Sequence, residues 1–208
     1  MKKRILSMSL ALALVLGCGA FAACGAENEM PSDEINIGAT STSDGQHADS
    51  VEESKSQEQE PYILTFEAIT TEGEELTSDI FAQSRLTMIN VWATYCNPCL
   101  SEMPDLGAIA TEYDKADFQM IGIISDVMAD SEQSDIDYAK QLIEETSATT
   151  YPHLLLNESL YMNLVGGVSA VPTTFFVNQE GELLGYVTGA QAKVTWNSLI
   201  EDLLAEME

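Results

Sequence analysis

The sequence predicts one α/β domain, a sandwich with a mixed sheet, over residues 61–208. Two nearly continuous apolar runs, Arg85–Ala93 and Phe118–Ser125, are typical of strands buried on both faces of a sheet. Segments with helical spacing of apolar residues alternate with these runs, as they do in α/β proteins. Residues 173–188 have the pattern of a hairpin, which adds antiparallel strands and makes the predicted sheet a mixed one.

The first half of this domain is predicted to contain two strands, a helix and a third strand. Tyr62–Ile69 alternates as a strand, and residues 71–74 form a turn. After the buried strand Arg85–Ala93, apolar residues recur every three or four positions, so a helix is expected from Pro98 to about Asp114. The buried strand Phe118–Ser125 follows it.

The second half is predicted to begin with a helix at Ser134–Thr146, whose acidic residues lie at the positive end of the helix dipole. A short strand at Tyr151–Leu156 and a short helix at Glu158–Val165 come next, and two glycines end that helix. After the hairpin, Ala190–Met207 is expected to be a closing amphipathic helix with Val194 on its buried side.

Composition and charge exclude several classes of function. The chain of 208 residues is 45% hydrophobic, enough for a folded core, and has a formal net charge of −26. Such an acidic chain has no basic surface to neutralise phosphates, so nucleic-acid binding is excluded. For the same reason, binding to anionic lipid headgroups requires a separate anchor. Residues 61–208 alone hold 24 acidic residues against 4 basic residues, a charge of about −20.

Residues 1–23 have the features of a lipoprotein signal peptide. Basic residues at positions 2–4 precede an apolar run, Ile5–Leu16, that is shorter than the roughly 20 residues of a membrane-spanning helix. Small residues then surround Cys18 and Cys24, and both sites resemble the lipobox of bacterial lipoproteins, where cleavage precedes a lipid-carrying cysteine. Lipidation of Cys24 is favoured, because cleavage before Cys18 leaves Cys24 as an exposed, unpaired thiol. A plain secreted protein and an uncleaved N-terminal helix are the alternatives.

Residues 24–60 are predicted to form a disordered acidic tether. Residues 25–60 contain ten acidic residues against one lysine, and their scattered apolar residues follow no helical or strand period. Such a segment buries too little apolar surface to offset the entropy lost on ordering it. We therefore expect this segment to hold the domain away from the membrane.

The Cys-Asn-Pro-Cys motif at residues 96–99 is the strongest chemical signal in the sequence. It lies where a predicted buried strand ends and a helix begins, so unpaired backbone N–H groups and the helix dipole stabilise a thiolate there. Cys96 is predicted to be the exposed nucleophile, and Cys99, deeper in the helix, the resolving thiol.

Two other interpretations of the cysteine pair remain open. Half of a zinc site requires further ligands, and the candidates are His47 in the tether and His153, which is expected to pack at a strand end. A purely structural disulfide is the second interpretation, although a bridge over so few residues closes a small loop and stabilises little.

Residues 90–99, Asn-Val-Trp-Ala-Thr-Tyr-Cys-Asn-Pro-Cys, resemble the active-site segment of thioredoxin-like proteins of the TlpA/ResA type. Residues 167–175 resemble the loop whose cis-proline lies against the disulfide in thioredoxin folds. Glu102 stands where this branch commonly has a functionally important acidic residue, and Asn90 stands where cytoplasmic thioredoxins have a buried aspartate. The resemblance covers about residues 61–208 and implies a thioredoxin-like fold, with helices on both faces of the sheet and an N-terminal strand extension.

The resemblance also implies a role for each residue around the pair. The expected catalytic residues are Cys96, Cys99, Glu102 and Pro172, and the expected substrate-contacting residues are Trp92, Tyr95 and Val171. Pro172 is expected to be cis and to lie beside Cys96, and Glu102 to take the Cys99 proton during exchange. Tyr95 departs from the family pattern, which more often has tryptophan at this position.

As a whole, the resemblance implies a monomeric thiol–disulfide oxidoreductase, lipid-anchored to the bacterial cell membrane and acting outside the cytoplasm. It implies disulfides of partner proteins as substrates and a membrane electron donor of the CcdA/DsbD type, with no cofactor and no metal. The Asn97-Pro98 dipeptide lacks the histidine that helps to make the strongest oxidants, so a reductase is favoured.

Two alternatives share the fold. A thiol peroxidase requires a threonine three residues before its reactive cysteine and a supporting arginine, whereas here position 93 is Ala and the nearest arginine is Arg85. A copper chaperone of the Sco type has three residues between its cysteines and a distant histidine ligand. The spacing in this chain is one residue shorter.

Overall fold

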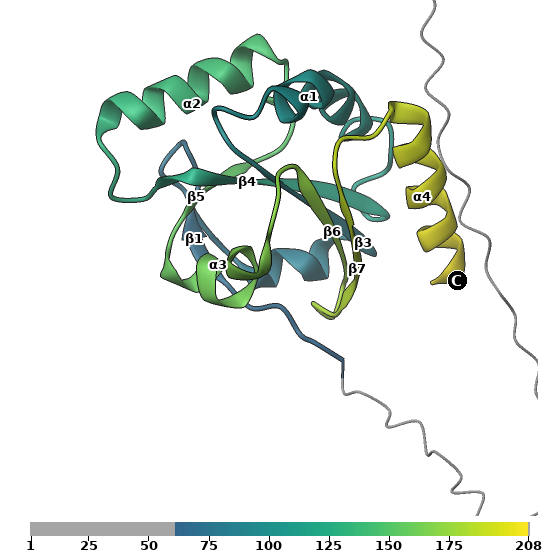
Figure 1. Cartoon of the computed structure of the whole chain (residues 1–208). Helices are drawn as coiled ribbons and strands as arrows, with labels where there is room; N and C mark the ends of the chain where they lie inside the picture. The colour runs from purple at the N-terminus through teal and green to yellow at the C-terminus, as the bar shows by residue number, and fades with distance from the viewer. Residues whose placement is uncertain (1–60, 208) are drawn as a thin grey trace, which may run out of the picture. The chain divides into compact units, whose positions relative to one another are not determined.

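The computed structural model describes residues 61–207 (Figure 1). The predicted signal peptide at 1–23, the predicted lipidation site Cys24 with its alternative Cys18, and the predicted tether at 24–60 lie outside the described residues. Within residues 61–207, no helix combines the length and the apolar character needed to cross a membrane.

A mixed sheet forms the centre of the domain, as the sequence predicted, and it has five strands. Its strands are β3 (Leu86–Trp92), β4 (Phe118–Met128), β5 (His153–Leu156), β6 (Thr173–Asn178) and β7 (Leu183–Thr188). They lie in the order β5-β4-β3-β6-β7. The β3–β4 and β4–β5 pairs are parallel, and the β3–β6 and β6–β7 pairs are antiparallel.

Helices cover both faces of this sheet (Figure 1). The remaining elements are β1 (Glu67–Ile69), β2 (Glu75–Thr77), the 3₁₀ helix η1 (Ser78–Gln83), α1 (Asn97–Ile109), α2 (Gln133–Glu145), α3 (Glu158–Asn163), the 3₁₀ helix η2 (Val165–Gly167) and α4 (Lys193–Glu206). Helices α1, α2 and α4 share one hydrophobic core with the sheet, which we call the α1 face. The segment containing β1, together with η1 and α3, shares the second core, which we call the α3 face.

Alternation along β3 divides its side chains between these two faces. Met88 and Trp92 lie in the core of the α1 face, whereas Ile89 and Val91 lie in the core of the α3 face. All seven residues of β3 are buried, which explains the continuous apolar run in its sequence.

The N-terminal part of the domain differs from the prediction. A strand was predicted over Tyr62–Ile69, but the regular strand is β1 alone, and it pairs with β2, which was not predicted. Before β1, the chain makes an isolated bridge between Ile63 and Glu182 of the hairpin. The predicted alternation still holds, because Leu64, Phe66 and Ala68 are buried and Thr65 and Glu67 between them are exposed.

Boundaries of other elements also differ from the prediction, and helix α1 ends at Ile109 although it was predicted to reach about Asp114. Strand β4 continues to Met128, past its predicted end at Ser125, with an irregularity in its pairing to β5. In α4, Val194 is 75% exposed although it was predicted to be buried, and Trp196 occupies the core instead. Helix α4 begins at Lys193, and Val194 lies about 200° around this helix from Trp196, so Val194 faces solvent when Trp196 and Ile200 are buried.

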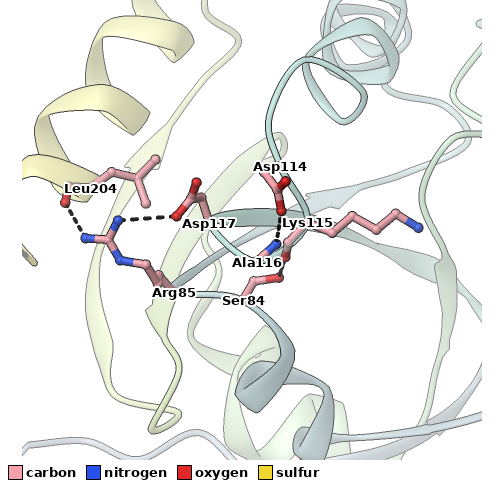
Figure 2. Close-up of polar contacts among 7 residues, drawn as sticks. All are labelled: Ser84, Arg85, Asp114, Lys115, Ala116, Asp117 and Leu204. Atoms are coloured by element: carbon pink, nitrogen blue, oxygen red, sulfur yellow. Dashed lines mark hydrogen bonds and ion pairs between the residues drawn. The ribbon is translucent and has the colours of Figure 1, made fainter.

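A polar cluster fixes the start of β3 (Figure 2). The Arg85 guanidinium donates a hydrogen bond to the Leu204 carbonyl near the C-terminus of α4, over 2.9 Å, and pairs with Asp117 at 3.3 Å. The Ser84 hydroxyl donates to the Lys115 carbonyl over 2.5 Å. Because the cysteine motif follows the other end of β3, Arg85 lies at the end of the sheet opposite the disulfide.

Candidate active site

The two cysteines of the motif form a disulfide at the N-terminus of α1. Cys96 is the residue that caps this helix, and the Cys99 backbone N–H donates a hydrogen bond to the Cys96 sulfur over 3.2 Å. The Leu100 N–H donates to the Cys96 carbonyl over 3.1 Å, and Pro98 occupies the first turn, where no helical hydrogen bond is lost. The helix start therefore directs a backbone donor at one sulfur, an arrangement that favours a thiolate.

The two sulfurs differ in access to solvent. Cys99 is completely buried, and Cys96 retains 6% of its exposure. The sequence predicted an exposed Cys96, whereas the disulfide form leaves only this small part of it accessible. Cys96 is nevertheless the more exposed of the two cysteines, as predicted.

A second segment completes the surroundings of Cys96. The Val171–Pro172 peptide bond is cis, as predicted. The Val171 carbonyl oxygen lies 3.6 Å from the Cys96 sulfur, so residues far apart in the sequence meet at the disulfide. Pro172 itself is buried, and Val171 is partly exposed.

Glu102 lies on α1, one turn beyond Cys99, and is only 4% exposed. Asn90 donates its side-chain amide to one Glu102 oxygen over 3.2 Å, and the Gln191 N–H donates to the other over 3.1 Å. Burial raises the pKa of Glu102 above its ordinary value, and these two hydrogen bonds, together with the nearby Trp196 indole N–H, offset part of the rise. Side chains three apart on a helix are neighbours, so Glu102 and Cys99 lie on the same side of α1.

The prediction that Trp92 contacts a substrate is wrong. Trp92 is completely buried, and its indole N–H donates to Nδ1 of His153 over 3.2 Å, so it forms a wall of the core. Tyr95 and Val171, its two predicted companions, do reach the surface, and Tyr95 is 73% exposed.

His153 is a buried, neutral partner of Trp92. Because Nδ1 accepts the indole N–H, Nε2 carries the proton and donates it to the Ala148 carbonyl over 2.9 Å. Burial lowers the pKa of His153 to about 4. Both ring nitrogens are hydrogen-bonded, which leaves neither as a metal ligand. Across residues 61–207, no group of three His, Cys, Asp or Glu side chains is placed to hold a metal ion.

The family model described as the AhpC/TSA family matches residues 61–185, more than half of the chain. The chain belongs to the AhpC/TSA family. This match spans the strands that flank the cysteine motif and the loop that contains Pro172.

Curated relatives of this AhpC/TSA-family chain are named as thiol–disulfide oxidoreductases. ResA of Oceanobacillus iheyensis is 32% identical over 104 residues, which are 50% of this chain and 49% of that protein. Sporulation thiol-disulfide oxidoreductase A of Bacillus subtilis is 24% identical over 147 residues, 67% of this chain and 82% of that protein. The chain thus spans about half the length of the ResA protein and more of the sporulation protein.

Solved structures show the same thioredoxin-like fold. A thiol:disulfide interchange protein of the thioredoxin family from Chlorobium tepidum aligns with a TM-score of 0.57 at 20% identity, covering 71% of this chain and 99% of that one. DsbF of Mycobacterium tuberculosis aligns with a TM-score of 0.56 at 20% identity, and the alignment covers 69% of this chain and 98% of that one. The fold class implied by the sequence resemblance is therefore confirmed.

One residue that holds the active-site loop of this family member was not predicted from the sequence. The Asp126 carboxylate accepts hydrogen bonds from the Thr94 N–H, over 3.0 Å, and from the Thr94 hydroxyl, over 2.6 Å. Its neighbour Ser125 donates to the Trp92 carbonyl over 2.9 Å. Asp126 is a residue of β4, because this strand continues to Met128, three residues past its predicted end. The unusual acidic residue at the end of an apolar run was the signal that could have identified it.

Proposed function

We propose that this chain is a thiol–disulfide oxidoreductase that reduces disulfides in partner proteins outside the cytoplasm. The observation that supports this most strongly is the Cys96–Cys99 disulfide at the start of α1, with the Cys99 N–H directed at the Cys96 sulfur. The names of the curated relatives agree with this activity.

The first step uses Cys96 of the reduced protein as the nucleophile. The Cys99 N–H and the helix dipole stabilise the Cys96 thiolate, which attacks one sulfur of a client disulfide. A mixed disulfide forms between Cys96 and the client. The client's other sulfur leaves as a thiolate and takes a proton from water.

The second step transfers the remaining electrons. Cys99 gives its thiol proton to the Glu102 carboxylate, and its thiolate attacks the Cys96 sulfur of the mixed disulfide. The Cys96–Cys99 disulfide forms, and the client's second sulfur leaves as a thiolate that is then protonated. The cysteine pair is oxidised by two electrons, the client disulfide is reduced, and Glu102 returns its proton to solvent.

The cycle requires a reductant that restores the two thiols. We assign this role to a membrane electron donor of the CcdA/DsbD type, reached by a monomer that a lipid on Cys24 anchors to the membrane. The basic and apolar N-terminal residues and the polar segment after them support this location.

The client-binding surface is expected at Tyr95 and Val171, which are accessible beside Cys96. The domain charge of about −20 favours clients with a neutral or basic face, because like charges repel. Three of the four basic side chains of residues 61–207, those of Arg85, Lys140 and Lys193, are also paired with carboxylates.

Replacing Cys99 with Ala tests the proposal, because the mixed disulfide then has no internal thiol to resolve it. Expressed in the native host, Cys99→Ala should accumulate mixed disulfides with client proteins, seen as bands that dithiothreitol removes and identified by mass spectrometry. Cys96→Ala is the matched control and should trap none. Consumption of peroxide or retention of copper without any trapped protein would contradict the proposal and support the peroxidase or the chaperone. The place of Arg85 at the far end of the sheet already argues against the peroxidase.

A further inference from the structure

Three ionisable side chains are buried behind the disulfide on the α1 face. Glu102 is 4% exposed, His153 is 3% exposed and Tyr151 is 6% exposed. No other Asp, Glu, Lys, Arg, His or Tyr side chain of residues 61–207 is buried to this degree. The proposed exchange uses Glu102, and Trp92 accounts for His153, so Tyr151 is the member of the group without a role.

The register of the sheet places His153 close to Asn90. Asn90 of β3 is opposite Gly122 of β4, and Gly122 is opposite His153 of β5. A Cβ on Gly122 would lie 2.3 Å from the His153 Nδ1, so the imidazole occupies the space that the glycine leaves open. The histidine ring therefore extends over β4 toward the strand whose Asn90 amide holds Glu102.

Tyr151 lies against this histidine, beneath α1. Its ring centroid is 4.5 Å from that of His153. The preceding residue, Thr150, donates its hydroxyl to the Gly107 carbonyl of α1 over 2.8 Å, which fixes the chain against that helix. After burial, the charge of Glu102 is the next cause that raises the pKa of the Tyr151 phenol, which agrees with their proximity.

The Tyr151 hydroxyl has no hydrogen-bond partner among the described residues, although it is buried. A buried donor without an acceptor is unfavourable, so such a group needs an explanation. Each Glu102 oxygen accepts one hydrogen bond in the disulfide form. An ionised carboxylate has about four acceptor sites, so Glu102 has capacity for another donor.

We propose that the Tyr151 hydroxyl donates a hydrogen bond to the Glu102 carboxylate when the disulfide is reduced and Glu102 is ionised. This inference rests on the proposed function, in which Glu102 takes the Cys99 proton. Burial disfavours the ionised carboxylate, and a donated hydrogen bond restores it. Tyr151 keeps its own proton throughout, so it is a positioning residue that maintains Glu102 as a base.

The other groups around Glu102 have different roles. Asp105 on α1 bears the same charge and raises the pKa of Glu102. The Asn90 amide of β3 and the Gln191 N–H before α4 already donate to it. The Trp196 indole N–H of α4 also lowers the pKa of Glu102 and has no hydrogen-bond partner among the described residues, so it is a second donor on the α4 side. Cys99 is the group from which Glu102 is to receive a proton. On the β5 side of the core, His153 has committed its proton to Ala148, so Tyr151 is the donor available from that side.

Tyr151→Phe tests the proposal, because it removes the hydroxyl and keeps the ring against His153. In the reduced full-length protein, the Glu102 carboxyl titration is followed by carbon-13 NMR, and the rate of exchange with a small disulfide is measured against pH. Both midpoints are expected to move upward by about one pH unit or more. Tyr113→Phe is the matched control, since Tyr113 packs against the same core but against the Phe118 ring, and the charges that raise its pKa are those of Glu201 and Glu112. It should shift neither midpoint.

A Tyr151→Phe protein with an unchanged Glu102 titration would overturn the proposal. A shift in the rate profile that persists in the Glu102→Gln background would also overturn it, because the tyrosine would then act through another group. The NMR titration separates this outcome from failure of the proposed function. If the wild-type protein exchanges no disulfide while Glu102 still shifts in Tyr151→Phe, the contact exists and the function is wrong.

Discussion

The two faces of β3 have the same degree of burial but different chemistry. On the α3 face, Ile89 and Val91 contact aliphatic and phenylalanine side chains. On the α1 face, Asn90 and Trp92 make hydrogen bonds to Glu102 and His153. Burying apolar groups is favourable, whereas burying polar groups is costly unless they are hydrogen-bonded. The comparison indicates that the α3 face stabilises the domain and that the α1 face also serves the disulfide.

The largest expected effect is on the chemistry of the α1 face. Cys96→Ser should reduce the exchange rate by about 10³-fold or more, because a hydroxyl does not replace the thiolate as nucleophile. Reduction of a protein disulfide by the purified variant is the measurement. If exchange continues at the wild-type rate, Cys96 is not the nucleophile and the two faces do not differ as described.

A cavity on the α3 face should lower the free energy of unfolding and leave the exchange rate unchanged. Ile89→Ala should lower the free energy of unfolding by about 2–5 kcal/mol, since Ile89 is 1% exposed and its removal leaves unfilled space. The exchange rate of the folded fraction should stay at the wild-type value. Denaturant unfolding and exchange assays on the same sample check both parts. A loss of exchange greater than the loss of folded protein would show that the α3 face also serves the disulfide.

The buried histidine should give the α1 face a characteristic pH dependence. The pKa of His153 is about 4 when folded and about 6.5 when unfolded, so the unfolded chain binds a proton that the folded chain does not. The contribution of His153 should therefore lower the free energy of unfolding by up to roughly 3 kcal/mol as the pH falls from 6.5 to 4. Glu102 has the opposite sign, because its raised pKa favours the folded state as the pH falls.

Denaturant unfolding of the wild type and of His153→Gln at several pH values isolates this contribution. Gln has an acceptor and a donor that can replace those of the imidazole, and it does not titrate. The difference in unfolding free energy between the two proteins should narrow as the pH falls. A constant difference over this range would show that His153 is not held neutral in the folded protein.

Removing the buried carboxyl should affect exchange and spare the fold. Glu102→Gln should slow exchange with a protein disulfide by about 10-fold, the usual range for a positioned acid–base group. The free energy of unfolding at pH 7 should be unchanged or higher, because no charge is buried. Asn90 Oδ1 has no partner among the described residues, so the Asn90 amide can reverse to accept from the new Gln amide.

Asp105→Asn is the matched control for this variant, since Asp105 is on the same helix but exposed. It should leave the exchange rate within about 2-fold of the wild type, because Asp105 is the smallest of the causes that shift the pKa of Glu102 and its exposed charge is screened by solvent. Equal effects of the two substitutions would contradict a special role for Glu102.

The smallest expected effect concerns the loop before Cys96. Asp126→Ala removes the acceptor for both donors of Thr94, so exchange should slow by a few-fold while the free energy of unfolding changes by about 1 kcal/mol or less. Asp130→Ala, at an exposed acid four residues later, is the control and should change neither quantity. If Asp126→Ala and Asp130→Ala have the same exchange rate, Asp126 does not position the loop.

The sequence was sufficient for the sheet and for the cysteine pair. Strands β3 and β4 were predicted because continuous apolar runs are hard to bury otherwise, and the motif lies where a strand leads into a helix. A role for Glu102 was implied by the family resemblance. Strand β2 was missed because three residues of mixed character form no pattern.

The polar groups behind the disulfide could not be predicted because they depend on strand register. Asn90, Gly122 and His153 are far apart in the sequence and meet only when β3, β4 and β5 pair as they do. The hydrogen bond between Trp92 and His153 follows from the same register, whereas the burial of Trp92 agrees with the predicted buried strand Arg85–Ala93. Periodicity shows which residues share a face, but it does not show which strands are neighbours.

Equilibration of the Cys96–Cys99 pair with a thiol redox buffer, read by alkylation and mass spectrometry, tests the central claim most directly. A redox-active pair should show a two-electron equilibrium between about −120 and −270 mV, and a reductase should lie toward the negative end of that range. A value near −120 mV would contradict the direction of electron flow. A disulfide that remains oxidised below about −300 mV would be a structural cross-link, and the account of an exchange enzyme would be wrong.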